Sequence, residues 1–426
     1  TEQMADDLNK GWGGVGSWNG SPTLLPEEAK GGEYPTYGST ETNYQLISLR
    51  AVTEENDDGD PTNDEWIPYD DPMWDALLDQ LTWDDTVALL SYGQRESVAI
   101  EHIGKPRVVD HNGGNGPNQS YSVGSNGLAT RKNDSMRSES PVVYPCNGIV
   151  ASTFNKELAY YYGCQWGEDM LWSGMSGLYG MGLNTHRSAY GGRNFEYYSE
   201  DPVLMGVIAG ETTKGMATRG AYVYLKHCVL NDQETYRCGG FTWANEQSIR
   251  EIYLRSYEIA ISDYGAQGVM GGLNSIGMMG TGVQGFFNTV LRDEFGMTGI
   301  VVTDTTSAMG ANFALSVFYG NDLPDGEVKN AFDFAKPVSE GGTGEYGNFA
   351  WAMRESVHRI LYTVVHSNAM NGRAATDKYY RVTPPWIYVL NGAEITIGVL
   401  FGLSAAAFGV SLYLNRKEFF CRGKQK

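Results

Sequence analysis

The sequence predicts an α/β fold, namely a TIM-like (β/α)8 barrel followed by a single C-terminal transmembrane helix. Apolar strand-like runs alternate with helical segments, a pattern that gives a mostly parallel sheet. Polar residues gather where these runs end. In a (β/α)8 barrel the C-terminal ends of all strands face one active site, whereas a doubly wound sheet, the alternative, collects ligands at one switch point. A charge-free stretch near the end of the chain predicts the membrane helix.

Four runs carry the strand pattern. They are KPRVVDHN at 105–112, GAYVYLKHCVLN at 220–231, AQGVMGGLN at 266–274 and GIVVTD at 299–304. Asp110 and Asn112 stand at the end of the first run, Lys226 and His227 follow a Tyr/Val alternation in the second, and Asp304 ends the last. These side chains are therefore expected at one end of the barrel.

Helical segments lie between the strand-like runs. The segment 201–220 has Pro202 at its start and Gly220 at its end, as helices often do. The segment 245–265 begins with Asn245, a favourable N-cap residue, and stops at a glycine. Both are expected to cover the sheet.

The run GGRNFEYYSEDP at 191–202 combines Arg193 with glycines, carboxylates and tyrosines. Such a mixture packs poorly but can hold a polyhydroxylated ligand. Its acidic end with Pro202 is typical of a helix start, so Arg193 is expected on a loop just ahead of a helix, where binding groups usually lie. Taken alone, the arginine fits a structural ion pair equally well.

Three segments in order, GLNTHRSAYGGRNFEYYSEDP, YLKHCVLNDQETYR and GIVVTD, resemble glycoside hydrolase family 3, the β-glucosidase-like retaining glycosidases. The segment 77–93 resembles the family's first barrel helix, and 153–170 and 318–326 match further landmarks. The resemblance covers about residues 72 to 371. It implies a barrel domain that acts on oligosaccharides or glycosides. We expect no cofactor, and the sequence has no zinc-site spacing.

The resemblance also implies roles for individual residues. Asp304 would be the nucleophile that forms a covalent glycosyl-enzyme intermediate. Arg193, Lys226 and His227 would hold hydroxyls of the sugar in the cleaved subsite, and Arg237 would support that subsite. The charges agree, because nearby Lys and Arg keep a carboxylate ionised. Without the resemblance, Asp304 fits a helix-capping residue and His227 a core histidine.

Three positions depart from the family pattern. Asn112 stands where an Asp that binds outer sugar hydroxyls is expected, with Asp110 two residues earlier. Leu273 replaces an aromatic residue that orients the nucleophile, and Thr305 replaces the usual Trp or Tyr after it. These departures leave open a catalytically impaired, membrane-anchored carbohydrate-binding protein. A β-xylosidase is the enzymatic alternative.

The general acid/base is not assigned. A retaining mechanism needs two carboxyl groups about 5 Å apart, and family members of the β-glucosidase type take the second from a sandwich domain. We expect that domain upstream, with the loop-rich acidic segment 1–71 as a linker or its end. The acidic residues of this segment, Asp57, Asp58, Asp60, Asp64 and Glu65, fit a solvated loop better than calcium, since EF-hand spacing is absent.

The C-terminal part is read as membrane-bound. After the barrel at 72–371, the chain divides into a linker at 372–394, a transmembrane helix at 395–414 and a basic tail at 415–426. Twenty helical residues span about 30 Å, the thickness of a bilayer core. The basic tail is cytoplasmic by the positive-inside rule, so the barrel would be extracellular. A buried core helix is the alternative.

The composition limits the classes of partner that the protein can bind. A net charge of −20 and a pI near 4.7 argue against nucleic-acid binding. Cys228 and Cys238 flank the Lys-His and Arg motifs, but spacing does not fix their pairing. The sequence therefore predicts a membrane-tethered, exo-acting retaining β-glycosidase, foremost a β-glucosidase, with a glycoside substrate and the bilayer as partners.

Overall fold

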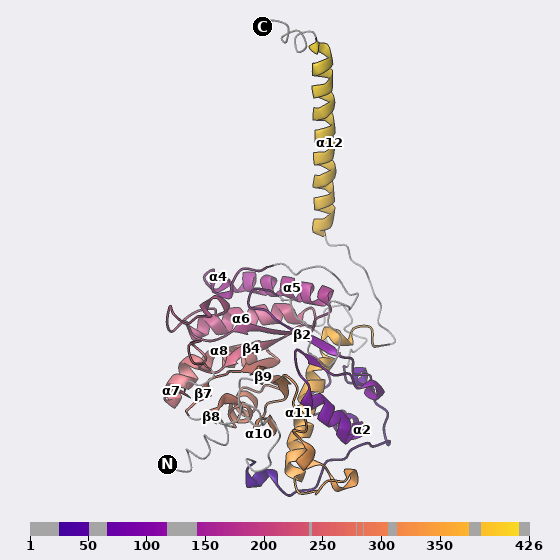
Figure 1. Ribbon diagram of the computed structural model, residues 1–426, viewed down its shortest axis with the longest axis vertical. Coiled ribbons are helices and arrows are strands. Elements are labelled where there is room, and N and C mark those ends of the chain that lie inside the picture. The colour runs from indigo at the N-terminus through magenta and orange to yellow at the C-terminus, as the bar shows by residue number, and fades with distance from the viewer. Residues whose placement is uncertain are drawn as a thin grey trace. The chain divides into compact units, whose positions relative to one another are not determined.

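The computed structural model describes residues 25–50, 66–116, 143–237, 241–277, 279–283, 285–305, 313–374 and 385–416. The chain forms two compact units, residues 1–375 and 376–426 (Figure 1), which are described separately. The acidic cluster at 57–65, Cys238 and Cys421 lie outside the described residues. The predictions made for them stay untested.

The first unit is built on a curled sheet in the order β1-β2-β3-β4-β6-β9-β10. The strands are β1 (Glu96–Ser97), β2 (Val108–Asn112), β3 (Gly177–Gly182), β4 (Tyr222–Cys228), β6 (Gly268–Gly271), β9 (Ile300–Thr305) and β10 (Leu323–Asp325). From β2 to β10 all neighbours are parallel. A smaller sheet joins β5 (Phe241–Thr242), β7 (Ser275–Ile276) and β8 (Met279–Gly280). The four predicted strand runs are thus confirmed.

The described part of the sheet has six parallel strands, where the (β/α)8 prediction expected eight. β1 runs antiparallel to β2, because the short connection between them cannot hold the dozen or more residues of a parallel crossover. The chain reverses there through a 3-10 turn at Glu101–Ile103 and Gly104, whose φ of 66° is left-handed. An antiparallel bridge between Tyr92 and Glu327 links the two edges of the curl.

Side chains alternate along the strands between two apolar cores. Tyr179, Tyr224, Met270, Val302 and Leu323 belong to the core that includes the inside of the curl. Their neighbours Leu178, Val223, Leu225, Val269 and Val301 belong to a second core with the helices α5 and α6. This period of two fixes which residues reach the interior.

Helices surround the curled sheet (Figure 1). They include α4 (Asn147–Ala151), α5 (Lys156–Ser173), α6 (Pro202–Ala217), α10 (Phe313–Phe318) and α11 (Gly347–Val365). A helical run from 246 to 263 contains α7 (Glu246–Ser248), α8 (Arg255–Glu258) and π-helical stretches at Ile249–Tyr253, Ile259–Asp263; another π-helix spans Phe287–Glu294.

The predicted helices at 201–220 and 245–265 are confirmed. Asp201 caps α6 by accepting from the backbone N–H groups of Val203 and Leu204. Asn245 caps the second run by accepting from the backbone N–H of Ser248. Each ends near a left-handed glycine, Gly220 in the first case.

The segment 77–93 forms parts of two helices instead of one. α2 (Pro72–Gln80) ends before Leu81, and α3 (Trp83–Ser91) starts directly after Thr82. The break has a local cause. Thr82 and Asp85 form a reciprocal capping box, which satisfies the free N–H groups of a new helix start.

Residues 25–50 pack against the barrel although they contain only 3-10 turns at Glu27–Ala29 and Leu46–Leu49. Ala29, Leu46 and Leu49 are fully buried in the same core as α11. The side chain of Asn348 donates to the backbone oxygens of Glu28 and Lys30, at 3.1 and 2.9 Å. The division of the chain at residue 72 remains a prediction.

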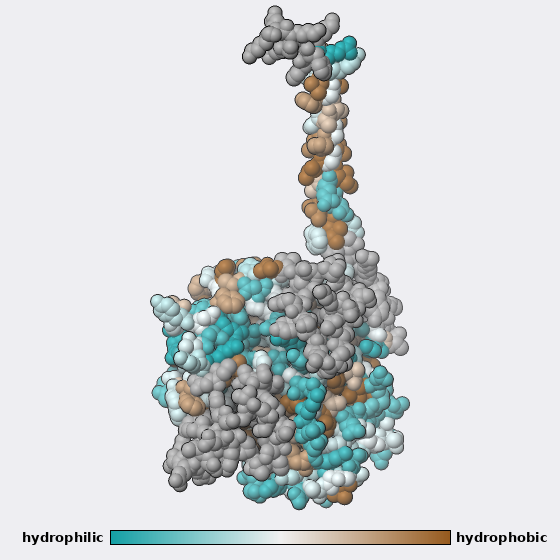
Figure 2. Space-filling view, viewed as in Figure 1, coloured by the Kyte–Doolittle hydropathy of each residue, from teal (hydrophilic) through white to brown (hydrophobic). Residues whose placement is uncertain are grey.

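The second unit contains α12 (Pro385–Leu414), a helix of 30 residues that includes the predicted span. Its most apolar window has a mean hydropathy of 2.0, and none of it is buried in the structure. Apolar side chains surround much of its length (Figure 2). Its length and composition are sufficient for a helix that crosses a membrane. A signal sequence or the buried core helix of a soluble protein meets the same two criteria.

Candidate active site

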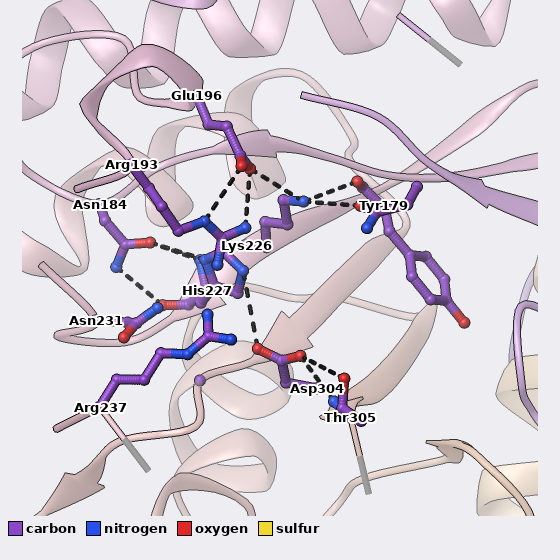
Figure 3. Close-up of polar contacts among 12 residues, drawn as sticks. Tyr179, Asn184, Arg193, Glu196, Lys226, His227, Asn231, Arg237, Asp304 and Thr305 are labelled. Atoms are coloured by element: carbon purple, nitrogen blue, oxygen red, sulfur yellow. Dashed lines mark hydrogen bonds and ion pairs between the residues drawn. The ribbon is translucent and has the colours of Figure 1, made fainter. Parts of the chain in front are cut away.

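A cavity of 410 Å³ lies at the carboxyl ends of the strands. Asp304 reaches it from the end of β9, Lys226 and His227 from the end of β4, and Arg193 from the loop before α6 (Figure 3). Its lining consists of Arg95, Asn112, Tyr179, Arg193, Glu196, Lys226, His227, Glu234, Arg237, Met270, Asp304, Thr305 and Asp325. Six of the seven residues predicted from the sequence therefore line one pocket.

Glu196 joins two of the predicted cations. Its Oε2 lies 2.9 Å from Nη2 of Arg193 and 3.2 Å from Nζ of Lys226. Burial acts to raise the pKa of Glu196, but Lys226 and Arg193 outweigh it and hold the pKa below its ordinary value. Burial lowers the pKa of Lys226, and Glu196 works against that change. The arrangement therefore keeps a fixed carboxylate between two cations.

A second carboxylate holds the outer arginine. Oε2 of Glu234 lies 2.9 Å from Nη1 of Arg237, and its Oε1 lies 3.8 Å from Nη1 of Arg193. Arg193 is thus flanked by Glu196 and Glu234, which limits the directions its guanidinium can take. Both arginines are presented on one side of the cavity as oriented donors.

His227 is held by its backbone. Its N–H donates to Oδ1 of Asn184 at 2.7 Å, and Nδ2 of Asn184 donates to its carbonyl at 3.0 Å (Figure 3). Nε2 of His227 lies 3.8 Å from Oδ2 of Asp304, which is beyond hydrogen-bond distance. Burial, with Arg193 and Lys226, holds the pKa of His227 well below its usual range. The imidazole is therefore neutral and offers a hydrogen bond instead of a charge.

Asp304 is oriented by the residue that follows it. Its Oδ1 accepts from the backbone N–H of Thr305 at 2.7 Å and from the hydroxyl at 3.4 Å. Within the described residues, its Oδ2 has no hydrogen-bond partner. Leu273 is buried and brings no polar side-chain atom to the nucleophile position. One oxygen of the carboxylate is thus fixed, and the other faces the cavity.

Asn112 and Asp110 lie apart despite their spacing in sequence. Asn112 lines the cavity, and its Oδ1 accepts from Nζ of Lys226 at 3.1 Å. Asp110 is not among the lining residues. It is buried and accepts from the hydroxyls of Tyr222 and Tyr224, at 2.8 and 3.0 Å. Burial raises its pKa to about 6. The structure therefore offers Asp110 as a support inside the curl, not as a ligand group.

Sequence reasoning missed several lining residues. Glu196 stands three residues after Arg193, and Glu234 three before Arg237, a spacing that could have indicated ion pairs. Asp325 lies in the segment 318–326, which was used only as a family landmark. Arg95, Tyr179 and Met270 carry no motif that could have identified them.

The pocket suits a neutral, polyhydroxylated ring. It places three arginines, a lysine, a neutral imidazole and several carboxylates around one cavity, so both donors and acceptors are available. Among the residues that the structure describes, no group of three His, Cys, Asp or Glu side chains could hold a metal ion. Asp304, with one carboxylate oxygen fixed and the other facing the cavity, is placed to act on a ligand held there.

Comparison with known proteins shows similarity to β-glucosidases. Residues 134–319 match the family described as the glycosyl hydrolase family 3 N terminal domain. β-Glucosidase A of Butyrivibrio fibrisolvens is 34% identical over 184 residues, which are 43% of this chain and 22% of that protein. A β-glucosidase of Rhizobium radiobacter is 32% identical over 234 residues, which are 54% of this chain and 27% of that protein.

The fold is likewise similar to a solved structure. β-Glucosidase 3B from Thermotoga neapolitana in complex with glucose is 27% identical with a TM-score of 0.59, over 69% of this chain and 42% of that one. The curled parallel sheet is thus shared. The chain spans about a quarter of the length of the two curated relatives and less than half of the solved structure.

Proposed function

We propose, because residues 134–319 match the N-terminal domain of glycosyl hydrolase family 3, that the protein is a glycosidase that removes terminal sugars from glycosides. The relatives favour a β-glucosidase. A cavity of 410 Å³ has room for one sugar ring, which supports exo-action. A β-xylosidase would bind xylose, which lacks the C6 hydroxymethyl group, in the same pocket.

One observation carries the proposal. Asp304 has one oxygen fixed by Thr305 and the other turned to the cavity, 3.8 Å from the neutral His227. This is the arrangement that a nucleophilic carboxylate requires. In the proposed retaining mechanism, Oδ2 of Asp304 bonds to C1 of the sugar while the bond from C1 to the leaving oxygen breaks. Water then releases the sugar.

The surrounding charges support this chemistry. Arg193 and Lys226 are held around Glu196, so they are positioned before the sugar arrives. Preorganised donors cost no reorganisation during the reaction. The acid/base that protonates the leaving oxygen stays unassigned, and we expect it from a further domain, as the family resemblance implies.

We also propose that α12 anchors the protein in a membrane. Thirty helical residues measure about 45 Å, long enough to cross a bilayer core of about 30 Å. Arg416 at its end supports a basic cytoplasmic flank, and in that orientation the barrel would lie outside the cell.

The decisive test is covalent labelling of the full chain in detergent with 2,4-dinitrophenyl 2-deoxy-2-fluoro-β-glucoside. Its leaving group needs no proton, so the result does not depend on the acid/base. The intact mass should rise by one fluoroglucosyl group, and the label should map to Asp304. The Asp304→Asn variant should stay unlabelled, while Asp333→Asn, an exposed carboxylate outside the pocket, should label like the unmodified protein.

The alternative is a sugar-binding protein without catalysis, which the neutral amide of Asn112 favours. In that case calorimetry would detect glucose binding while no label is gained, and the glycosidase proposal would be wrong. Faster labelling by the corresponding fluoroxyloside would instead favour a β-xylosidase.

A further inference from the structure

The segment 184–186 follows β3 and contacts three parts of the site in succession. Asn184 holds the backbone of His227. The backbone N–H of Thr185 donates to Oδ1 of Asp232 at 2.9 Å. The third residue of the segment is a histidine that does not line the cavity and has no role in the proposed mechanism.

This histidine, His186, is bound to the loop that carries Arg193. Its Nε2 lies 2.9 Å from the carbonyl oxygen of Asn194 and 3.0 Å from that of Tyr197. A carbonyl oxygen accepts and never donates, so Nε2 carries a proton and shares it between the two oxygens. The two carbonyls belong to the first residue of the 3-10 turn Asn194–Glu196 and to the residue that follows it. One imidazole N–H therefore spans the whole turn.

The turn places two residues of the pocket (Figure 3). Arg193 stands directly before it and Glu196 is its last residue, and their side chains form an ion pair at the cavity. Tyr197 is fully buried and fixes one end of the turn, but Phe195 in its middle is 51% exposed. A three-residue 3-10 turn also has poorer hydrogen-bond geometry than an α-helix. Its position therefore depends on donors from outside the turn.

α4 supplies a second donor of this kind. Nδ2 of Asn147, which is buried at the start of α4, donates to the carbonyl oxygen of Glu196 at 2.7 Å. Of the four carbonyls from 194 to 197, three are thus bound by side chains that lie outside the turn. The backbone that carries the pocket arginine is held from two directions.

We propose that His186 is a positioning residue for the sugar subsite, because its N–H fixes the turn that directs Arg193 and Glu196 into the cavity. The proposal rests on the proposed glycosidase function and adds a residue that acts on the sugar only through Arg193. A long guanidinium side chain binds a ring hydroxyl well only when its backbone is fixed beforehand. Loss of the imidazole donor should therefore weaken sugar binding without removing any group that touches the sugar.

The test is calorimetric binding of glucose to the full chain in detergent. His186→Leu removes the donor but keeps an apolar side chain. Its Kd for glucose should rise roughly 10- to 150-fold, the factor that corresponds to the loss of one hydrogen bond from a charged group. His186→Gln offers two amide N–H donors to the same carbonyls and should return the Kd to within about threefold of the unmodified value. Asn147→Ala removes the second donor, should also raise the Kd, and serves if His186→Leu does not fold.

His366→Leu is the matched control. His366 is likewise half-buried, and its Nδ1 donates to the carbonyl oxygen of Tyr362 at 2.8 Å. It stands at the end of α11 and does not line the cavity. Its variant should lower Tm and leave the Kd for glucose unchanged. A merely structural role for His186 would give the same result as this control.

An Arg193→Ala background tests the route of the effect. The readout is the rate of labelling by the fluoroglucoside, followed by intact mass. In the unmodified background, His186→Leu should slow labelling chiefly by raising the concentration needed for the half-maximal rate. In the Arg193→Ala background, the same change should alter the rate by less than about twofold, because the two residues act as one unit. Equal effects in both backgrounds would mean that His186 does not act through Arg193.

The outcomes separate the two proposals. If the unmodified chain binds glucose and gains the label while His186→Leu keeps the same Kd, the positioning proposal is wrong and the glycosidase proposal stands. If glucose binds but no label is gained, the glycosidase proposal is wrong, and the Kd of His186→Leu still decides the role of the histidine. If the unmodified chain neither binds glucose nor gains the label, both proposals fall together.

Discussion

The buried ion pairs of Glu196 with Arg193 and Lys226 should contribute far more to the free energy of unfolding than a Glu–Arg pair on the surface. Its side chain is 11% exposed, and that of Lys226 is 3% exposed. The change Glu196→Gln leaves Lys226 and Arg193 without their buried counter-charge. Removing one partner of a buried pair costs about 3 to 5 kcal/mol. Nζ of Lys226 keeps its bonds to Asn112 and Tyr179, which favours the lower figure.

The assay is thermal unfolding at pH 7, followed by tryptophan fluorescence. With about 2.1 cal/mol/K of unfolding entropy per residue, the 375-residue unit has about 0.8 kcal/mol/K. Glu196→Gln should therefore lower Tm by about 4 to 6 °C. Glu168→Gln is the control, because Glu168 pairs with Arg219 at 2.6 Å while both side chains are over one third exposed. Such a pair contributes about 0 to 1 kcal/mol, or about 1 °C.

The pH dependence gives the same reasoning a second check. The folded-state pKa of Glu196 lies below its ordinary value of 4.5. Its contribution is therefore present above pH 4.5 and is lost as pH falls through the folded-state pKa. The difference between the unmodified protein and Glu196→Gln should be constant from pH 5 to 7 and shrink below pH 4. Equal Tm shifts for Glu196→Gln and Glu168→Gln would refute the reasoning.

Two predictions concern other parts of the chain. The pKa of Asp110 is raised from 3.8 to about 6. The protonated carboxyl therefore stabilises the fold below pH 3.8, and this contribution of about 3 kcal/mol is lost as pH rises through about 6. In urea titrations between pH 4 and 7, the unmodified protein should lose stability relative to Asp110→Asn, and parallel curves for the two proteins would contradict this. Protease added to intact cells should degrade the barrel, and degradation only after permeabilisation would exclude the outward orientation.

The sequence predicted the strand ends well because the interior layer follows from local alternation. Lys226 and Asp304 each end an apolar run, and such runs become parallel strands whose ends meet. The position of Asp325 in the pocket was not predicted. Its strand has only three residues, one of them Pro324, which is too short to show an alternation of apolar and polar side chains. The antiparallel direction of β1 depends on the tight reversal at Gly104, and in the sequence only the short connection between β1 and β2 indicates it.

Other features depend on contacts that no local pattern encodes. Asp110 and Asn112 are two residues apart, yet the tyrosines that hold Asp110 come from β4, more than 100 residues away. Leu46 and Leu49 sit in a short 3-10 turn without helical periodicity, so the segment around them resembled a linker. They are buried against α11, which is close to them in space but lies about 300 residues later in the sequence.

That long-range packing has a consequence for biosynthesis. Ala29, Leu46 and Leu49 bury against a helix that ends at Val365, so their binding surface is made more than 300 residues after they are. At about 5 to 20 residues per second, these apolar side chains wait roughly 15 to 60 s after synthesis. During that interval they are sites for chaperones or for premature association. The segment 25–50 can therefore complete its packing only after α11 has been made, although it is among the first parts to be translated.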